Sequence, residues 1–193
     1  MLKKICFGFV VVVAVFAGVV ALRPSEFRVM RSAAIDAPAS EVFTQVNDFH
    51  NWDAWSPWAK LDPAMKATFE GPAAGTGAVY KWSGNDEVGE GSMTLTESRP
   101  NDRIDIALTF IRPFACTNTT EFTFVPEGDG TVVTWNMTGH LNFVCKAMHL
   151  FVDMDKMVGG DFEKGLTQMK SVTEAATKKQ RAANLSPTTG WRP

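Results

Sequence analysis

The hydrophobic pattern of this sequence changes period once, and this change restricts the possible folds more than any other feature. Between about residues 67 and 137, apolar residues alternate with more polar ones, most clearly from Ile104 to Phe110, as in β-strands with one buried face. From Gly159 to about Thr177, apolar residues recur at three- and four-residue steps, which is typical of a long amphipathic helix. The sequence therefore predicts a sheet whose apolar face is covered by one C-terminal helix.

The elements around this change complete an α+β order. Residues 27–35 alternate as a first strand, and Pro38 and Glu41 are typical of the start of a helix after it. A further helix is expected over Val144–Lys156. The other strands are expected after residue 67 and at residues 79–82, 91–97, 104–110, 120–124 and 133–137. We expect about seven antiparallel strands that curl around the C-terminal helix, and a cavity remains if the sheet curls more than the helix can fill. Val133, Trp135 and Met137 should face that helix, because a slip of one residue reverses all three.

The N-terminus begins with an apolar run, residues 5–22, that contains no charge and follows Lys3 and Lys4. As a helix this run is about 27 Å long, close to the roughly 30 Å of hydrocarbon in a bilayer. We therefore expect a single-pass transmembrane helix, with a cleaved signal peptide as the alternative. The domain is expected on the extracytoplasmic side of the membrane, which is the periplasm in a Gram-negative bacterium. The chain then divides into a membrane anchor or signal segment at 1–25, a folded domain at 26–180 and a disordered tail at 181–193.

Charge and composition exclude some partners and favour others. The net charge of -2 gives no long-range attraction to nucleic acid, so no nucleic-acid partner is expected. Six Trp, 14 Phe and nine Met supply bulky, adaptable apolar side chains. Cys116 and Cys145 lie within the expected domain, and we expect free thiols there because the spacing shows no disulfide framework.

Five segments carry a resemblance to a known superfamily. They are Ala37–Phe43, the tryptophan-rich segment Phe49–Trp58, Glu90–Thr96, Thr119–Trp135 and Asp153–Leu166. In this order they resemble the SRPBCC superfamily, which includes START lipid-transfer domains, polyketide cyclases and the birch pollen allergen group. The resemblance covers about residues 27–176 and implies the helix-grip fold. It does not by itself imply a chemistry, because one fold can host many functions.

Catalytic and metal-binding motifs are not apparent. Cys145 and His149 are four residues apart and could share a helix face, but nothing in the sequence activates the thiol. The acidic residues after Asp153 fail the EF-hand pattern, because Val158 and Lys164 occupy its glycine and final glutamate positions. We therefore predict no catalytic residue, no metal and no cofactor. Asn118 and Asn136 match the short N-glycosylation pattern, which is frequent by chance.

The remaining candidates for a site are apolar. The residues expected to converge between the sheet and the final helix are Trp52, Trp55, Trp82, Phe110, Phe122, Trp135, Met137, Phe162 and Leu166. They either line a ligand pocket or form an ordinary core. Ligand pockets are mostly apolar with a few polar groups, and Thr120, Asn136 or Arg112 could supply these.

Three functions are compatible with this pattern. The first is noncatalytic binding or carriage of a hydrophobic small molecule or lipid in an apolar cavity beside a membrane. The second is an enzyme that resembles a polyketide cyclase or dehydrase, which would need a polar pair inside the cavity. The third is a protein-interaction module, which predicts a filled core and an exposed apolar patch.

Overall fold

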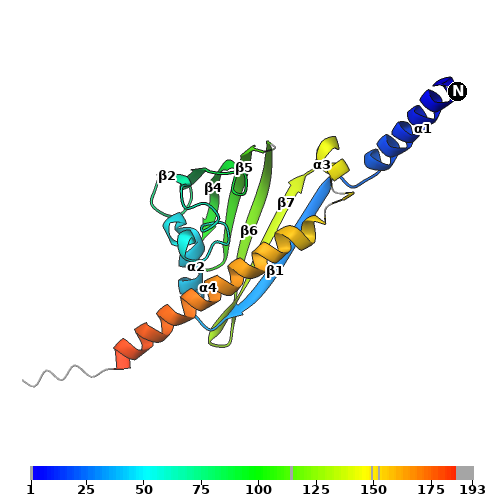
Figure 1. The fold of residues 1–193 in the computed structure, drawn as a ribbon. Coiled ribbons are helices and arrows are strands. Elements are labelled where there is room, and N and C mark those ends of the chain that lie inside the picture. The colour runs from blue at the N-terminus through cyan, green and yellow to red at the C-terminus, as the bar shows by residue number, and fades with distance from the viewer. Residues whose placement is uncertain (1, 114, 149, 152, 186–193) are drawn as a thin grey trace, which may run out of the picture.

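The computed structural model describes residues 2–113, 115–148, 150–151 and 153–185 (Figure 1). In chain order its helices are α1 (Leu2–Ala21), α2 (Ala39–Asn47), the 3-10 helix η1 (Phe49–Ala54), α3 (Phe143–Met148) and α4 (Met154–Leu185). Its strands are β1 (Glu26–Ile35), β2 (Lys66–Glu70), β3 (Val79–Ser83), β4 (Glu90–Arg99), β5 (Arg103–Arg112), β6 (Cys116–Glu127) and β7 (Gly130–His140).

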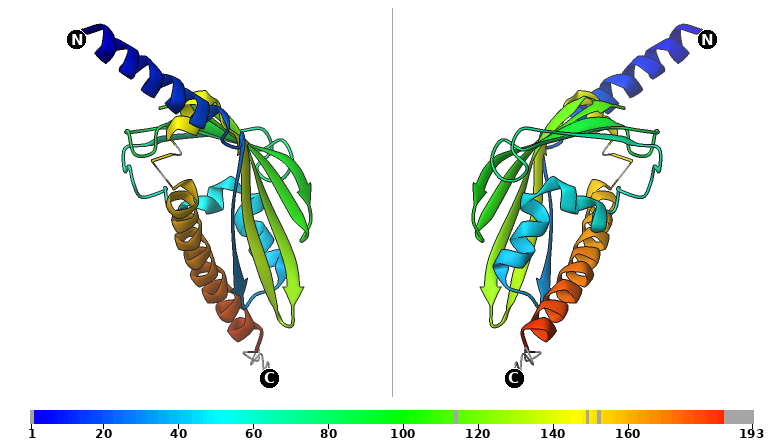
Figure 2. Two further views of the ribbon diagram at one scale, coloured as in Figure 1. Left: turned by 90° about the vertical axis from the view of Figure 1, so that its right-hand side faces the viewer. Right: turned by 90° about the vertical axis from the view of Figure 1, so that its left-hand side faces the viewer.

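The described strands form one seven-stranded antiparallel sheet in the order β1-β7-β6-β5-β4-β3-β2. Figure 2 shows α4, α2 and η1 on the same side of this curved sheet, with α4 running along β1. A curled sheet that grips a long C-terminal helix is the helix-grip arrangement expected from the sequence. This part of the prediction is confirmed.

The strand register assigns side chains to the concave face, which is the face toward α4. Trp135 of β7 lies opposite Phe122 of β6, and its ring stacks on Phe162 of α4 with centroids 3.9 Å apart and planes at 8°. Because side chains alternate along a strand, Val133 and Met137 share this face with Trp135. The predicted phase of the last strand is therefore correct.

Helix α4 approaches the sheet closely because of a glycine in its fourth turn. A Cβ at Gly165 would lie 3.0 Å from Cζ3 of Trp135 and 3.1 Å from Cδ of Pro57, closer than ordinary contacts. Glycine costs about 1 kcal/mol relative to alanine in a helix interior. Here it lets the aromatic ring lie directly against the helix backbone.

Three helix boundaries differ from those expected. The predicted helix at 144–156 is shorter, since α3 ends at Met148, and α4 begins at Met154 rather than near Gly159. The side chain of Asp153 accepts a hydrogen bond from the backbone N–H of Lys156, which satisfies a free donor at the start of α4. Helix α4 also continues to Leu185, past residue 181 where the tail was expected, and residues 186–193 lie outside the described residues.

The expectation of a transmembrane helix is contradicted. A span needs about 20 consecutive, predominantly apolar residues, and no helix in the described part of the chain is long and apolar enough to cross a membrane. The prediction of a single-pass membrane protein, with its domain on the extracytoplasmic side, is withdrawn with it.

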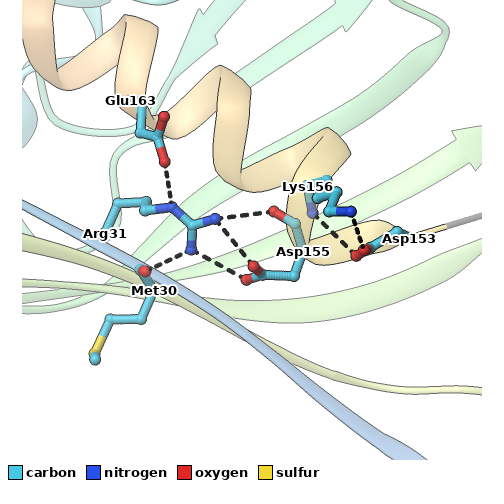
Figure 3. Close-up of polar contacts among 6 residues, drawn as sticks. All are labelled: Met30, Arg31, Asp153, Asp155, Lys156 and Glu163. Atoms are coloured by element: carbon cyan, nitrogen blue, oxygen red, sulfur yellow. Dashed lines mark hydrogen bonds and ion pairs between the residues drawn. The ribbon is translucent and has the colours of Figure 1, made fainter.

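Arg31 of β1 fastens the beginning of α4 to the sheet (Figure 3). Its Nε donates to Glu163 at 2.6 Å, and its two terminal nitrogens donate to the carboxylate of Asp155, each at 3.0 Å. The guanidinium lies across Gly159, where a Cβ would overlap it. Hydrogen bonding to Arg31 holds the pKa of Asp155 below its usual range. The contact therefore persists at neutral pH, and it weakens only when acid titrates Asp155 through that lowered pKa.

Replacing Arg31 should loosen the first turns of α4 without unfolding the sheet. We expect Arg31→Gln to speed amide hydrogen exchange over residues 155–163 several-fold, because these turns lose their charged tie to β1. The control is Arg99→Gln, whose ion pairs to Glu97 and Asp102 lie away from α4. Unchanged exchange in α4 of the Arg31 variant would contradict this role.

Candidate ligand-binding site

The nine predicted site residues separate into two groups. The packed aromatic cluster is buried between α4, η1 and the sheet, and it comprises Trp52, Trp55, Phe122, Trp135, Met137, Phe162 and Leu166. The second group is Trp82 and Phe110, which are half-buried and contact one another with ring centroids 5.8 Å apart. The predicted convergence therefore brings seven of the residues into one core cluster and leaves two at its margin.

Rings fill the space within the packed aromatic cluster. Phe122, Trp135 and Phe162 stack in series, with centroid distances of 4.9 and 3.9 Å. Trp52 and Trp55 pack edge-on against this stack, and their indole nitrogens donate to the carbonyl oxygens of Val46 and Gln45. These contacts tie η1 and the residue after it to α2.

Trp135 differs from the other two indoles of the cluster. Among the described residues, its Nε1 is buried without a hydrogen-bond partner. The Cζ3 edge of the ring faces Gly165, so the nitrogen, on the opposite edge, points away from that contact. A buried donor without a partner costs roughly 1–3 kcal/mol.

This difference predicts unequal effects for two tryptophan-to-phenylalanine substitutions. Trp135→Phe should change the free energy of unfolding by less than about 1 kcal/mol, because losing an unsatisfied donor offsets the smaller ring. Trp52→Phe should cost about 1–3 kcal/mol, because it leaves the carbonyl of Val46 unpaired. Chemical denaturation of both variants measures the two values, and an equal loss would contradict the assignment.

Trp82 and Phe110 belong to a second part of the concave face. This part is here called the β3–β6 surface, and it comprises Trp82, Leu108, Phe110, Cys116 and Asn118. The register places Trp82 opposite Gly91, Gly91 opposite Phe110, and Phe110 opposite Cys116. Leu108 and Asn118 form the adjacent cross-strand pair. Helix α4 runs along β1, at the far side of the sheet from β3, so this surface is less covered than the cluster (Figure 2).

Two glycines shape the floor of the β3–β6 surface and its border with β7. The ring of Trp82 lies across Gly91, where a Cβ would be 2.6 Å from two ring carbons, and its Nε1 donates to the carbonyl of Val88 at 2.9 Å. At Gly139 of β7, a Cβ would overlap the carboxamide oxygen of Asn118. Both side chains therefore lie close to the sheet backbone.

The electrostatics of this region favour neutral groups. Burial, followed by the nearby Cys145, raises the pKa of the Cys116 thiol. Burial, followed by Asp53, raises the pKa of Tyr80, whose ring lies in the same strand as Trp82 and stacks on it. Both groups stay protonated at neutral pH, and the five residues of the β3–β6 surface carry no formal charge.

Of the three polar residues expected inside the site, one is buried on the concave face and two are not. Thr120 is buried on the concave face, opposite Met137. Asn136 lies on the outer face and accepts a hydrogen bond from Arg28, and Arg112 is exposed and pairs with Glu90. Asn118, which was not predicted from the sequence to lie with these groups, is also buried on the concave face. The spacing in the sequence could have indicated this, because Asn118, Thr120 and Phe122 are two residues apart and therefore share one face of the strand.

The other groups considered from the sequence do not form a site. Cys116 and Cys145 are free thiols, as predicted, and both are half-buried. Among the described residues, no group of His, Cys, Asp and Glu could hold a metal ion. His149 lies outside the described residues, so its pairing with Cys145 stays untested. The two asparagines that match the glycosylation pattern are buried.

A separate groove of about 510 Å³ lies on the outer face, at the ends of β1, β6 and β7. Its lining includes Glu26, Arg28, Thr119 and His140, so charged and polar side chains contribute to its walls beside apolar atoms. None of the nine predicted site residues lines this groove.

The fold and the apolar concave face agree with a family assignment. The profile described as polyketide cyclase / dehydrase and lipid transport matches residues 26–174. The chain belongs to this family. The SRPBCC resemblance inferred from sequence is thus confirmed, and the family implies a fold that binds hydrophobic ligands. No curated protein matches the sequence.

Solved structures support the same fold at low sequence identity. A protein from Thermobifida fusca is 24% identical, with 76% of this chain and 92% of that chain covered and a TM-score of 0.57. The di-domain ARO/CYC BexL from the BE-7585A biosynthetic pathway is 19% identical, with 80% of this chain and 52% of that chain covered and a TM-score of 0.57. The Aha1 dimer from Colwellia psychrerythraea is 14% identical, with 77% and 96% covered and a TM-score of 0.56. Such likenesses establish the fold and not the activity.

Proposed function

We propose that this polyketide cyclase / dehydrase and lipid transport family member binds a hydrophobic small molecule on the β3–β6 surface, without catalysis. The observation that carries the proposal is the half-buried aromatic pair Trp82 and Phe110, which continues the concave apolar face beyond the packed aromatic cluster. An apolar ligand there would remove these rings from water, which contributes roughly 25 cal/mol per Å² of buried apolar area.

The polar groups of this surface suit binding better than proton transfer. A general acid or base works best with a pKa near the operating pH. Asn118 does not titrate in water, and the raised pKa of Cys116 keeps its thiol protonated. The cyclase-like alternative would need an acid–base pair, and the described residues of the β3–β6 surface do not supply one.

A titration with 2-methylnaphthalene tests the proposal. The full-length chain should bind it saturably, with one molecule per chain, as followed by chemical-shift changes of the Trp82 indole N–H. Phe110→Ala should weaken this binding by several-fold, because the probe loses one of the two rings that enclose it. The variant should also lose less stability than a substitution in the packed aromatic cluster, since Phe110 is already partly open to solvent.

Ile111→Ala is the matched control. Ile111 is the next residue of β5, and it is 55% exposed. Its removal should leave the affinity for 2-methylnaphthalene unchanged. Absence of saturable binding to the parent chain would overturn the proposed function and favour the interaction-module alternative.

A further inference from the structure

Asn118 is an unusual residue for an apolar concave face. It is 6% exposed and is flanked by Leu108 of β5 and Gly139 of β7. A carboxamide offers two N–H donors and an oxygen with two lone pairs. Among the described residues, it makes one side-chain hydrogen bond, from Nδ2 to the sulfur of Cys116 at 3.9 Å. Sulfur is a weak acceptor, so most of the hydrogen-bonding capacity of Asn118 is unused.

Among the described residues, Nε1 of Trp135 is the one side-chain nitrogen or oxygen that is buried without a partner, so the carboxamide oxygen of Asn118 is not cut off from solvent or from a ligand. The carboxamide oxygen lies over Gly139, next to the ring of Phe27, on the face that the proposed ligand would contact. Asn118 therefore offers one neutral donor and acceptor at a defined point of an otherwise apolar surface.

The charged residues around Asn118 restrict the net charge of the ligand. Arg31 shares the concave face, but its guanidinium is committed to Asp155 and Glu163. Arg28 lies on the outer face, where it bonds to Asn136. An anionic ligand would therefore place its charge beside an amide and a protonated thiol, while Arg28, Arg31 and Arg112 are already bonded to other groups. Burying an unpaired charge is strongly unfavourable.

We propose that the ligand of the β3–β6 surface is a neutral apolar molecule with a single hydroxyl or carbonyl oxygen, which hydrogen-bonds to the carboxamide of Asn118. This inference rests on the proposed function. It names the class of molecule that the surface prefers: alcohols, phenols and ketones rather than ionised carboxylic acids or plain hydrocarbons.

Three probes that differ at one substituent test this preference. At pH 7, 2-naphthol is neutral, 2-naphthoate is ionised, and 2-methylnaphthalene has no polar group. The parent chain should bind 2-naphthol about five-fold more tightly than 2-methylnaphthalene, as expected for one net hydrogen bond. It should bind 2-naphthoate at least about ten-fold more weakly than 2-naphthol, because the carboxylate loses its hydration. Side-chain amide signals of Asn118 in ¹H–¹⁵N spectra should shift with 2-naphthol and hardly with 2-methylnaphthalene.

Asn118→Leu has nearly the same volume and removes the amide. It should bind 2-naphthol and 2-methylnaphthalene equally, and retained binding of 2-methylnaphthalene shows that the variant is folded. The matched control is Asn136→Leu on the outer face, which should keep the parent's preference. Should the parent rank 2-naphthoate first, or Asn118→Leu keep the preference for 2-naphthol, the inference is wrong while the proposed function stands. Failure of all three probes to bind the parent would overturn the proposed function itself.

Discussion

Phe162→Ala is expected to lower the free energy of unfolding by about 3–5 kcal/mol, which is typical of a phenylalanine removed from a packed core. Phe162 is 1% exposed and lies parallel to Trp135 at 3.9 Å. Its loss leaves a cavity between α4 and the sheet that Gly165, one turn further along the helix, cannot fill. Chemical denaturation followed by circular dichroism measures the change.

The control for this substitution is Phe143→Ala. Phe143 is 53% exposed on α3 and lies outside the packed aromatic cluster. Its removal should change stability by no more than about 0.5 kcal/mol, as for ordinary surface substitutions. A small loss for Phe162→Ala would mean that the interface between α4 and the sheet is loosely packed, contrary to the stacking described above.

Trp55→Ala should be comparably severe, at about 3–5 kcal/mol. The side chain of Trp55 is fully buried, it packs against Phe122 and Trp135, and its Nε1 donates to the carbonyl oxygen of Gln45 at 3.0 Å. The substitution removes this apolar volume and also leaves the carbonyl without its donor, so α2 and the segment after η1 lose a shared anchor.

Trp58→Ala serves as the comparison, because Trp58 lies three residues further along and is only half-buried. It contacts the edge of the same stack, at 5.9 Å from Trp135 and 6.5 Å from Phe162. We expect a clearly smaller loss of stability than for Trp55→Ala. Equal losses in thermal or chemical unfolding would contradict the assignment of Trp55 to the centre of the core.

The strand pattern was predictable because alternation couples directly to burial. Ile104 and Ile106 are both fully buried on one face of β5, as their period-two spacing indicates. Helix ends were less predictable, since the start of α4 depends on Asp153 as a cap and on the tie between Arg31 and Asp155. Such contacts across the fold leave no local signal in the sequence.

The sequence predicted which aromatic residues share the concave face, but it did not predict which of them are packed and which are half-buried. Trp82, Phe110, Phe122 and Trp135 all occupy the concave face, so periodicity places them together. Whether a ring is packed or half-open depends on where α4 crosses the sheet, which no local pattern specifies. The expected membrane span shows a related limit. The uncharged run at 5–22 predicted a transmembrane helix, yet no helix of the described residues is long and apolar enough to span a membrane.

The most direct test of the account is the location of a bound probe, measured by nuclear Overhauser effects between 2-naphthol and the full-length chain. Binding at the β3–β6 surface predicts contacts from the naphthol ring protons to the Trp82 indole, the Phe110 ring and the Leu108 methyl groups. It also predicts that Phe110→Ala weakens the contacts at Leu108. Contacts to Thr119 and His140 in the outer groove, with none to Trp82 or Phe110, would contradict the assignment of the β3–β6 surface as the ligand-binding site.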